Sequence, residues 1–167
     1  MRSTHARPVL LAAALAAAGI AAGVAFKSAH ADDEKWTSKP SFRKGVLVVE
    51  APSGDLPLKV DIAESNRQRA YGMMFRERVA EDEGMIFLFD DDGVKTFWMK
   101  NTITPLDMIF IGRDWKVVGV YADAKPHSLE RMTVGKPSRY VLEVRAGWAK
   151  AHGVTAGTRV RFTNTQN

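Results

Sequence analysis

The residues best suited to binding or catalysis gather in one short stretch that begins at Trp98. Lys100, Asn101 and Thr102 follow this aromatic side chain where an expected strand runs into a loop. Asp107 then opens the next apolar run. A loop that carries an ammonium, an amide, a hydroxyl and a carboxylate beside an indole can hold a polar ligand against an aromatic face. In the architectural alternative, Asn101 and Asp107 bond the loop backbone, and Lys100 is solvated.

An enzyme is the rival interpretation of the same stretch. Asp107 would then be the acid or base, and Lys100 and Asn101 would stabilise developing charge. No motif supports this interpretation, because the sequence contains no G-x-S-x-G, no P-loop and no HExxH. His127 and His152 lie in different segments and form no metal-binding pair. Catalysis would depend on carboxylates that only the fold brings together.

Clustered methionines raise the possibility of a copper site. Met73, Met74 and Met99 lie near expected loops, and their thioethers are soft ligands that could bind Cu(I). Met85 and Met108 sit inside apolar runs, so they are expected to fill the core. The sequence alone leaves copper binding open.

An acidic run, Asp90-Asp91-Asp92-Gly93, could attract calcium. It lacks the alternating ligands and the distal glutamate of an EF-hand loop. Because it stands between two apolar runs, it predicts a charged hairpin tip rather than a metal site.

The composition indicates one small domain without disulfides. The chain has 167 residues, of which 46% are hydrophobic, and this is enough to enclose a single core. It contains no cysteine, which excludes disulfides, a thiol nucleophile, iron–sulfur clusters and thiolate zinc sites. No cofactor is expected.

The N-terminus has the pattern of an export signal. Arg2 and Arg7 form a basic start, residues 9–26 are an uncharged apolar run, and Ala29-His30-Ala31 fits a signal-peptidase site. We expect a signal peptide over residues 1–31 and a periplasmic product. In the alternative, residues 9–26 remain as an inner-membrane anchor. Removing residues 1–31 lowers the net charge from +5 to +2, which argues against a nucleic-acid partner.

The mature chain is expected to be a polar linker over residues 32–44, a single domain over 45–163 and a polar tail over 164–167. From Gly45 onward, short apolar runs alternate with turn residues, a pattern typical of β-strands. Met85–Phe89 is the most apolar run and is predicted to be a central strand, buried on both faces. The eight expected strands are Val46–Val49, Leu58–Ile62, Met85–Phe89, Thr96–Met99, Asp107–Ile111, Lys116–Tyr121, Arg139–Val144 and Arg159–Phe162.

Two short helices are expected, one over Glu64–Gly72, which Glu64 or Ser65 could cap, and one over Gly147–His152. Residues 112–114 predict a hairpin turn between two strands. These elements predict a mainly β (α+β) fold, namely a small compact, mostly antiparallel β-barrel or rolled sheet of about eight strands with one or two short helices.

Several segments resemble a known family in their residues and order. They are RAYGMMFR at 69–76, DEGMIF at 82–87, FWMKNT at 97–102, PLDMIF at 105–110 and RYVLEV at 139–144, followed by Gly147. From about Gly45 to Phe162, the sequence is similar to the domain of unknown function 192 family. The resemblance implies a small β-barrel and no known activity. Some members carry cysteines near residues 126–133, where this chain has none, so no thiol role carries over.

We expect an exported β-barrel protein that serves as a non-catalytic binding or accessory module of the cell envelope. The expected partner is an unknown small molecule or an envelope component. The alternative is an enzyme that acts on an envelope polymer or a small polar substrate through Asp107, Lys100 and Asn101. The candidate ligand-binding residues are Trp98, Lys100, Asn101, Thr102 and Asp107, joined by Arg69 from the first family segment.

Overall fold

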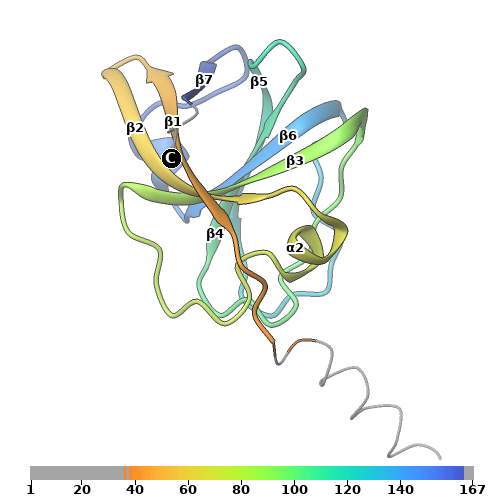
Figure 1. Cartoon of the computed structure of the whole chain (residues 1–167). Coiled ribbons are helices and arrows are strands. Elements are labelled where there is room, and N and C mark those ends of the chain that lie inside the picture. Colours follow the sequence, from red (N-terminus) through yellow and green to blue (C-terminus); the bar gives the residue numbers. More distant parts are fainter. Residues whose placement is uncertain (1–35, 37, 164–167) are drawn as a thin grey trace, which may run out of the picture. The chain divides into compact units, whose positions relative to one another are not determined.

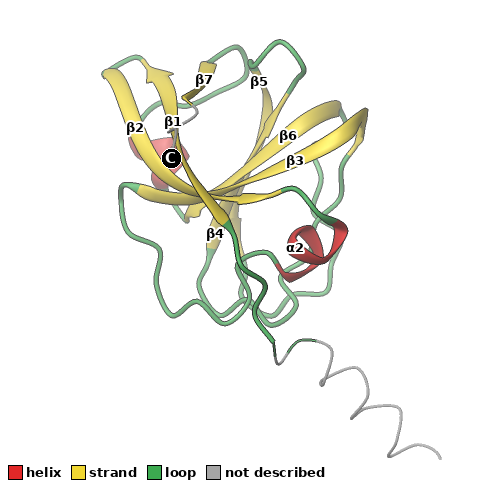
Figure 2. Cartoon of the chain, in the orientation of Figure 1, coloured by secondary structure: helices red, strands yellow, loops and turns green. Residues whose placement is uncertain are grey.

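The computed structural model describes residues 36 and 38–163, and a compact unit begins at Lys39. The expected signal peptide, most of the expected linker and the C-terminal tail lie outside the described residues. Within the described range, no helix is long and apolar enough to cross a bilayer. The elements, shown in Figure 2, are β1 (Arg43–Ala51), β2 (Gly54–Ala63), α2 (Asn66–Tyr71), β3 (Glu83–Val94), β4 (Leu106–Ile111), β5 (Val117–Ala124), β6 (Pro137–Arg145), α3 (Trp148–Ala151) and β7 (Arg159–Thr163).

The strands form one sheet in the order β5-β4-β6-β3-β2-β1-β7 (Figure 1). All neighbours pair antiparallel except β2 and β3, which are parallel and are connected through α2. The two edges approach each other where Val117 donates a backbone hydrogen bond to Thr158, at 2.9 Å. The sheet therefore curls into a half-barrel, and the prediction of a mainly β, mostly antiparallel fold is confirmed.

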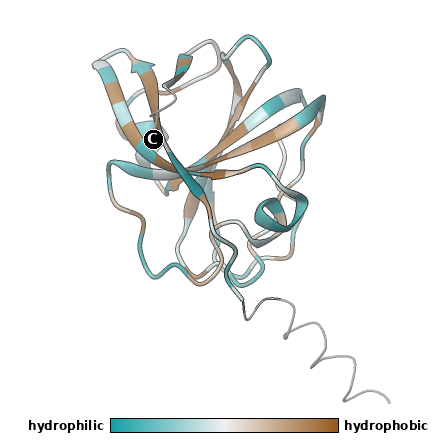
Figure 3. Cartoon of the chain, in the orientation of Figure 1, coloured by the Kyte–Doolittle hydropathy of each residue, from teal (hydrophilic) through white to brown (hydrophobic). Residues whose placement is uncertain are grey.

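The curled sheet has an apolar layer on each face. The inner face carries side chains from all seven strands, among them Leu47, Ile86, Leu142 and Val160, and packs against α3. The outer face carries side chains such as Phe87 and lies under the segment after α2 and the long loops that precede β4 and β6. Because side chains of a strand alternate between the faces, successive residues enter different layers. In Figure 3 the strands carry hydrophobic stretches between hydrophilic ones, whereas α2 is hydrophilic.

Two sequence predictions about β-structure are wrong. Thr96–Met99 forms no strand, because its backbone makes only an isolated bridge between Phe97 and Met132, so the described sheet has seven strands rather than eight. The acidic run 90–92 is not a hairpin tip, since it lies inside β3 where the register with β6 shifts. Arg113 forms an ion pair with Asp92 there, at 2.6 Å, which offsets the repulsion within the run.

The other local predictions agree with the structure apart from the element ends. The Met85–Phe89 run lies in β3, with its first three residues buried and its last two half-buried. A turn at Gly112 joins β4 to β5, and Trp115 donates to the Gly112 carbonyl at 3.0 Å. Helix α3 lies within the expected range. Helix α2 is shorter than expected, because Ser65 is its cap and Gly72 ends it in the left-handed region, at φ +50°.

Candidate functional site

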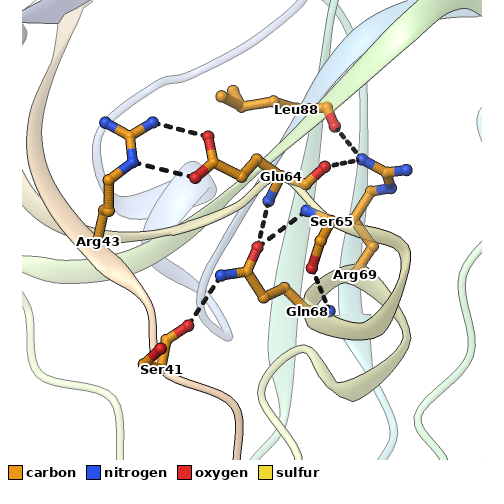
Figure 4. Close-up of polar contacts among 7 residues, drawn as sticks. All are labelled: Ser41, Arg43, Glu64, Ser65, Gln68, Arg69 and Leu88. Atoms are coloured by element: carbon orange, nitrogen blue, oxygen red, sulfur yellow. Dashed lines mark hydrogen bonds and ion pairs between the residues drawn. The ribbon is translucent and has the colours of Figure 1, made fainter.

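Helix α2 is attached to the sheet at its N-terminal end (Figure 4). Ser65 and Gln68 form a capping box, in which each side chain bonds the backbone N–H of the other residue. The Gln68 amide also donates to the Ser41 carbonyl at 2.8 Å. Arg43 of β1 holds Glu64 through two contacts of 3.0 and 2.7 Å. The helix therefore starts at a fixed position beside β1 and β2.

Arg69 attaches the same helix to β3. Its guanidinium donates to the carbonyls of Glu64 and Leu88, the latter at 2.8 Å (Figure 4). It also stacks over the Phe89 ring, at 5.2 Å from the centroid. These contacts hold the C-terminal end of α2 over the outer face of the sheet.

Three loops that also cover the outer face are joined to one another by backbone hydrogen bonds. Phe75 donates its backbone N–H to the Asn101 carbonyl at 2.9 Å, and His127 donates to the Thr102 carbonyl at 3.1 Å. Met99 donates to the Ser128 carbonyl at 2.8 Å. Phe75, Asn101 and His127 all have left-handed backbone, with φ between 54° and 62°, which non-glycine residues rarely adopt. The inter-loop hydrogen bonds maintain this costly conformation.

Between α2 and these loops the outer face contains a hollow of about 260 Å³, including the part open to solvent. We call it the outer-face pocket. Aromatic and thioether side chains dominate its wall, and basic and hydroxyl groups join them. Its lining residues are Arg69, Ala70, Tyr71, Gly72, Met73, Met74, Phe87, Phe97, Trp98, Lys100, Thr102 and Glu143.

Glu143 is the acidic member of this lining. Cross-strand register places it beside Met85 of β3 and Met108 of β4, so its side chain lies on the outer face. The residue is 4% exposed, and its carboxyl has no hydrogen-bond partner among the described residues. Burial in these apolar surroundings raises the pKa of Glu143 to about 8, although the Arg76 charge acts in the opposite direction. The carboxyl is therefore mainly protonated at neutral pH.

Asp61 lies in the same row of the sheet, opposite Met85, but its environment differs. Arg76 and Lys44 both form ion pairs with it. Burial alone would raise the pKa of Asp61, but hydrogen bonds from Lys44 and Arg76 outweigh that effect and lower it. Asp61 is thus a charged, paired carboxylate, and Arg76 is engaged with it rather than with Glu143.

The structure brings four of the predicted ligand-binding residues to one place. Arg69, Trp98, Lys100 and Thr102 all line the outer-face pocket. Asn101 lies beside it, and its amide contacts the Met74 sulfur at 3.9 Å.

Asp107 does not lie with these residues. It follows Leu106 on β4 and points to the inner face, where it is fully buried. One carboxylate oxygen accepts the backbone N–H of Asp123, and the other accepts that of Ala149 in α3, each at 2.9 Å. The expected convergence of Asp107 with Lys100 and Asn101 is not formed, because strand alternation separates them by the thickness of the sheet.

The methionines of the copper hypothesis are divided between environments. Met73 and Met74 line the pocket, and Met73 also belongs to the outer-face core, where Met99 is fully buried. Across residues 36 and 38–163, no three His, Asp or Glu side chains are grouped so as to hold a metal ion.

Glu143 was missed in the sequence. The available signal was its position in the strand Tyr-Val-Leu-Glu-Val, where an acidic residue interrupts an apolar run. Charged residues are almost never fully buried without a partner, so this position could have been flagged. Its neighbours from β3 and α2 could not have been named, because they depend on tertiary structure.

Fold and pocket together define a small half-barrel domain with a carboxyl-lined hollow on the outer face of its sheet. Residues 48–162 match the domain of unknown function 192, described as "Uncharacterized ACR", and the chain belongs to this family.

Two solved structures are similar to the chain. A candidate transcription regulator from Sinorhizobium meliloti 1021 shares 36% identity at a TM-score of 0.71, over 75% of this chain and 98% of that one. A protein of unknown function from Novosphingobium aromaticivorans DSM 12444 shares 32% identity at a TM-score of 0.69, over 76% of this chain and 95% of that one. No curated protein matches the chain.

Proposed function

We propose that this protein is an exported, non-catalytic module that binds a small ligand in the outer-face pocket. The observation that carries the proposal is the buried Glu143 carboxyl, which faces the pocket without a hydrogen-bond partner among the described residues. The carboxyl oxygens of Glu143 are not among the side-chain atoms that are both sealed from solvent and unbonded, so they are accessible from the pocket. A ligand group that enters the pocket can therefore bond this carboxyl, and the apolar wall would contact the rest of the ligand.

Binding is favoured over catalysis by the composition of the pocket. Glu143 is the carboxyl of the lining, which also contains Tyr71, Lys100 and Thr102. The Thr102 hydroxyl bonds the Lys100 carbonyl, and among the described residues no hydrogen bond joins Tyr71 or Thr102 to Glu143. Acid–base and nucleophilic mechanisms usually need a second group within hydrogen-bond reach. The enzyme alternative relied on Asp107, whose oxygens instead bond backbone N–H groups on the other face.

The size of the pocket limits the ligand. The 260 Å³ includes open solvent, and the enclosed space is about 20 Å³, roughly what one water molecule needs. The pocket therefore suits a single small group that protrudes from a larger envelope component, whose remainder would lie against the open rim.

A cell-envelope location is part of the proposal, and it rests on the basic start, the apolar run and Ala29-His30-Ala31. N-terminal sequencing of periplasmic material should show Asp-Asp-Glu-Lys, which begins at Asp32. A membrane-bound product that retains residues 1–31 would instead support the anchor. The description of the Sinorhizobium protein as a candidate regulator is not extended to this chain, since α2 and α3 have only six and four residues. A DNA-recognition helix that reads a major groove is usually longer.

Native mass spectrometry of the full chain, purified from cells that produce it, tests the proposal. Ala70→Trp places a large side chain on the pocket lining, whereas Ala151→Trp makes the same change on an exposed position of α3. We expect a bound small molecule on the wild type and on Ala151→Trp, and its loss from Ala70→Trp. Equal retention by both variants would place the ligand elsewhere, and conversion of the bound molecule during incubation would show an enzyme.

A further inference from the structure

Exposed apolar side chains are concentrated on the loops that cover the outer face. Among the described residues, five large hydrophobic side chains are between 41% and 66% exposed. Four of them, which we call the loop-tip patch, belong to the segment after α2 and to the loops before β4 and β6, namely Phe75, Trp98, Ile103 and Leu129. The fifth, Val94, ends β3. Isolated exposed hydrophobic residues are normal, but a group of them marks an interaction site.

Backbone hydrogen bonds between the loops hold the members of the patch near one another. The N–H of Phe75 donates to the loop that carries Trp98 and Ile103, at 2.9 Å. This loop in turn donates to the Ser128 carbonyl, next to Leu129, at 2.8 Å. Figure 1 shows these loops meeting at the lower end of the sheet, where β1 begins. Because the loops are fixed to one another, they lose little conformational freedom when the patch meets a partner.

Phe75 is presented to the surroundings by a strained backbone. Its φ of 62° lies in the left-handed region, which a bulky side chain rarely adopts. The residue is nevertheless 51% exposed, and its ring makes only a tilted contact with Tyr71, at 6.1 Å between centroids. Strain of this kind persists only where the surrounding structure enforces it, and it is most common at functional positions. Core packing therefore does not explain the conformation of Phe75.

The sequence before the described unit indicates which surface the patch meets. The uncharged apolar run 9–26 has the character of a segment that enters a membrane during export. Residues 27–38 separate it from Lys39, and they span at most about 40 Å when fully extended. The chain then enters β1 at the patch end of the sheet, where the Gln68 amide bonds the Ser41 carbonyl (Figure 1). This end is therefore tethered close to a bilayer during export, and permanently if the run is retained as an anchor.

The residue types of the patch suit a lipid surface. Tryptophan is enriched at the headgroup level of membranes, and phenylalanine, leucine and isoleucine partition into the boundary with the acyl chains. The four side chains come from three loops rather than from one helix or strand, so each can insert separately.

We propose that the loop-tip patch docks this protein on the surface of a lipid bilayer by shallow insertion of its four apolar side chains. The contact is apolar, and the sheet remains in water. Docking in this way brings the outer-face pocket, whose lining includes Trp98, to the membrane surface. The proposal goes beyond the ligand-binding function and does not depend on it.

Site-specific fluorescence on the full chain tests this docking. Because the chain contains no cysteine, one can be introduced at a chosen position. Leu129→Cys and Val94→Cys, each labelled with the same environment-sensitive fluorophore, place the probe on the patch and on a comparably exposed position at the end of β3. With vesicles of phosphatidylcholine and phosphatidylglycerol, the Leu129→Cys probe should shift its emission to shorter wavelength and be quenched by spin-labelled lipid. The Val94→Cys probe should do neither. An anchor formed by residues 9–26 would tether both proteins alike, so the contrast reports on the patch.

Two further substitutions in the Leu129→Cys background measure the contribution of the other loops. Phe75→Asn removes the ring and keeps a residue that tolerates left-handed backbone, and Ile103→Gln removes an exposed apolar side chain. Each should lower the ratio of inserted to free probe by about five- to tenfold, because one of four inserted side chains is lost. Val94→Gln should leave the ratio unchanged. Since the contact is apolar, the wild-type patch should remain inserted at about 1 M salt, where surface charges are screened.

Each contrary result would overturn the proposal in a recognisable way. Equal shifts at both labelled positions would mean that lipid contact comes from the tether alone, and no shift at either would mean that the patch stays in water. Insertion that disappears in high salt would assign the contact to charged groups. A shift that occurs without vesicles and grows with protein concentration would show that the patch is an interface between copies of this chain.

Discussion

Asp107 and Glu143 lie on neighbouring strands, one register step apart, and their side chains point to opposite faces of the sheet. Both are almost completely buried, at 0% and 4% exposure. Asp107 bonds two backbone N–H groups and joins β4 to α3, whereas Glu143 has no such bonds among the described residues and opens into the outer-face pocket. Burial alone therefore does not mark a functional carboxyl. A functional carboxyl is indicated instead by whether the surrounding residues already supply its hydrogen-bond partners.

Truncation of a buried apolar side chain should destabilise the protein to a similar extent on either face of the sheet. The two faces therefore differ in their polar groups. Phe87→Ala on the outer face should reduce the free energy of unfolding by about 3–5 kcal/mol, and Leu142→Ala on the inner face by about 2–5 kcal/mol, since both are fully buried. Urea melts measure both values. A loss below about 1 kcal/mol for Phe87→Ala would show that the outer-face layer is not a true core.

Asp107→Ala should reduce the free energy of unfolding by about 1–3 kcal/mol, because it leaves the buried Ala149 backbone N–H without an acceptor, whereas the N–H of the exposed Asp123 can bond water. The bound ligand detected by native mass spectrometry should be retained under conditions in which the variant is folded. Wild-type stability combined with lost binding would reverse the comparison and make Asp107 a site residue.

Glu143 should show the opposite behaviour in its pH dependence. Its pKa is raised from an ordinary value of 4.5 to about 8, so the folded protein keeps a proton that the unfolded chain loses between these values. The contribution of the protonated Glu143 to the free energy of unfolding is fully present below pH 4.5. Above that pH it decreases by about 1.4 kcal/mol per pH unit, and it is lost as pH rises through 8. Relative to Glu143→Gln, the wild type should lose about 2 kcal/mol between pH 5.5 and pH 7.

The difference between the two curves isolates Glu143, because groups with lowered pKa values, such as Asp61 and Glu64, contribute equally to both proteins. Parallel curves would mean that Glu143 is ionised or solvated in the folded state.

Lys100→Ala should have the smallest effect on stability, about 0.5 kcal/mol or less, because a half-buried loop lysine contributes little to folding. Thermal melts check this value, and native mass spectrometry should show weaker retention of the bound ligand at the same time. A large loss of stability would show that Lys100, like Asp107, has a structural role.

The sequence predicted the strands well where the two-residue alternation was long. It failed at Thr96–Met99, whose apolar residues look like a strand, because a strand also needs a neighbour, and only Phe97 finds one. The acidic run 90–92 was misplaced for a related reason. Pairing with β6 on both sides of the irregularity keeps the run within β3, and that partner is about 50 residues away along the chain.

The position of the outer-face pocket could be inferred in part from the sequence. The Trp98–Thr102 loop does border the pocket, since its residue types are unusual even without a fold. Asp107 was assigned to the same site because it is near in sequence. Counting alternation from Leu106 and Met108 would have placed it on the opposite face. The lack of a hydrogen-bond partner for Glu143 depends on three strands and a helix that the fold brings together, so it could not be recognised in the sequence.

The pairing of β1 with β7 has a consequence for how the chain is made. The first strand of the sheet keeps an open edge until residues 159–163 have been synthesised, because β7 pairs with it along Val46–Glu50. The contacts of Val117 with Gly157 and Thr158 across the two edges form equally late. A nascent chain can build the β1–β2 hairpin early, but the cooperative domain assembles only once residues 159–163 have emerged. Until then the unpaired edge of β1 is open to pairing with another chain.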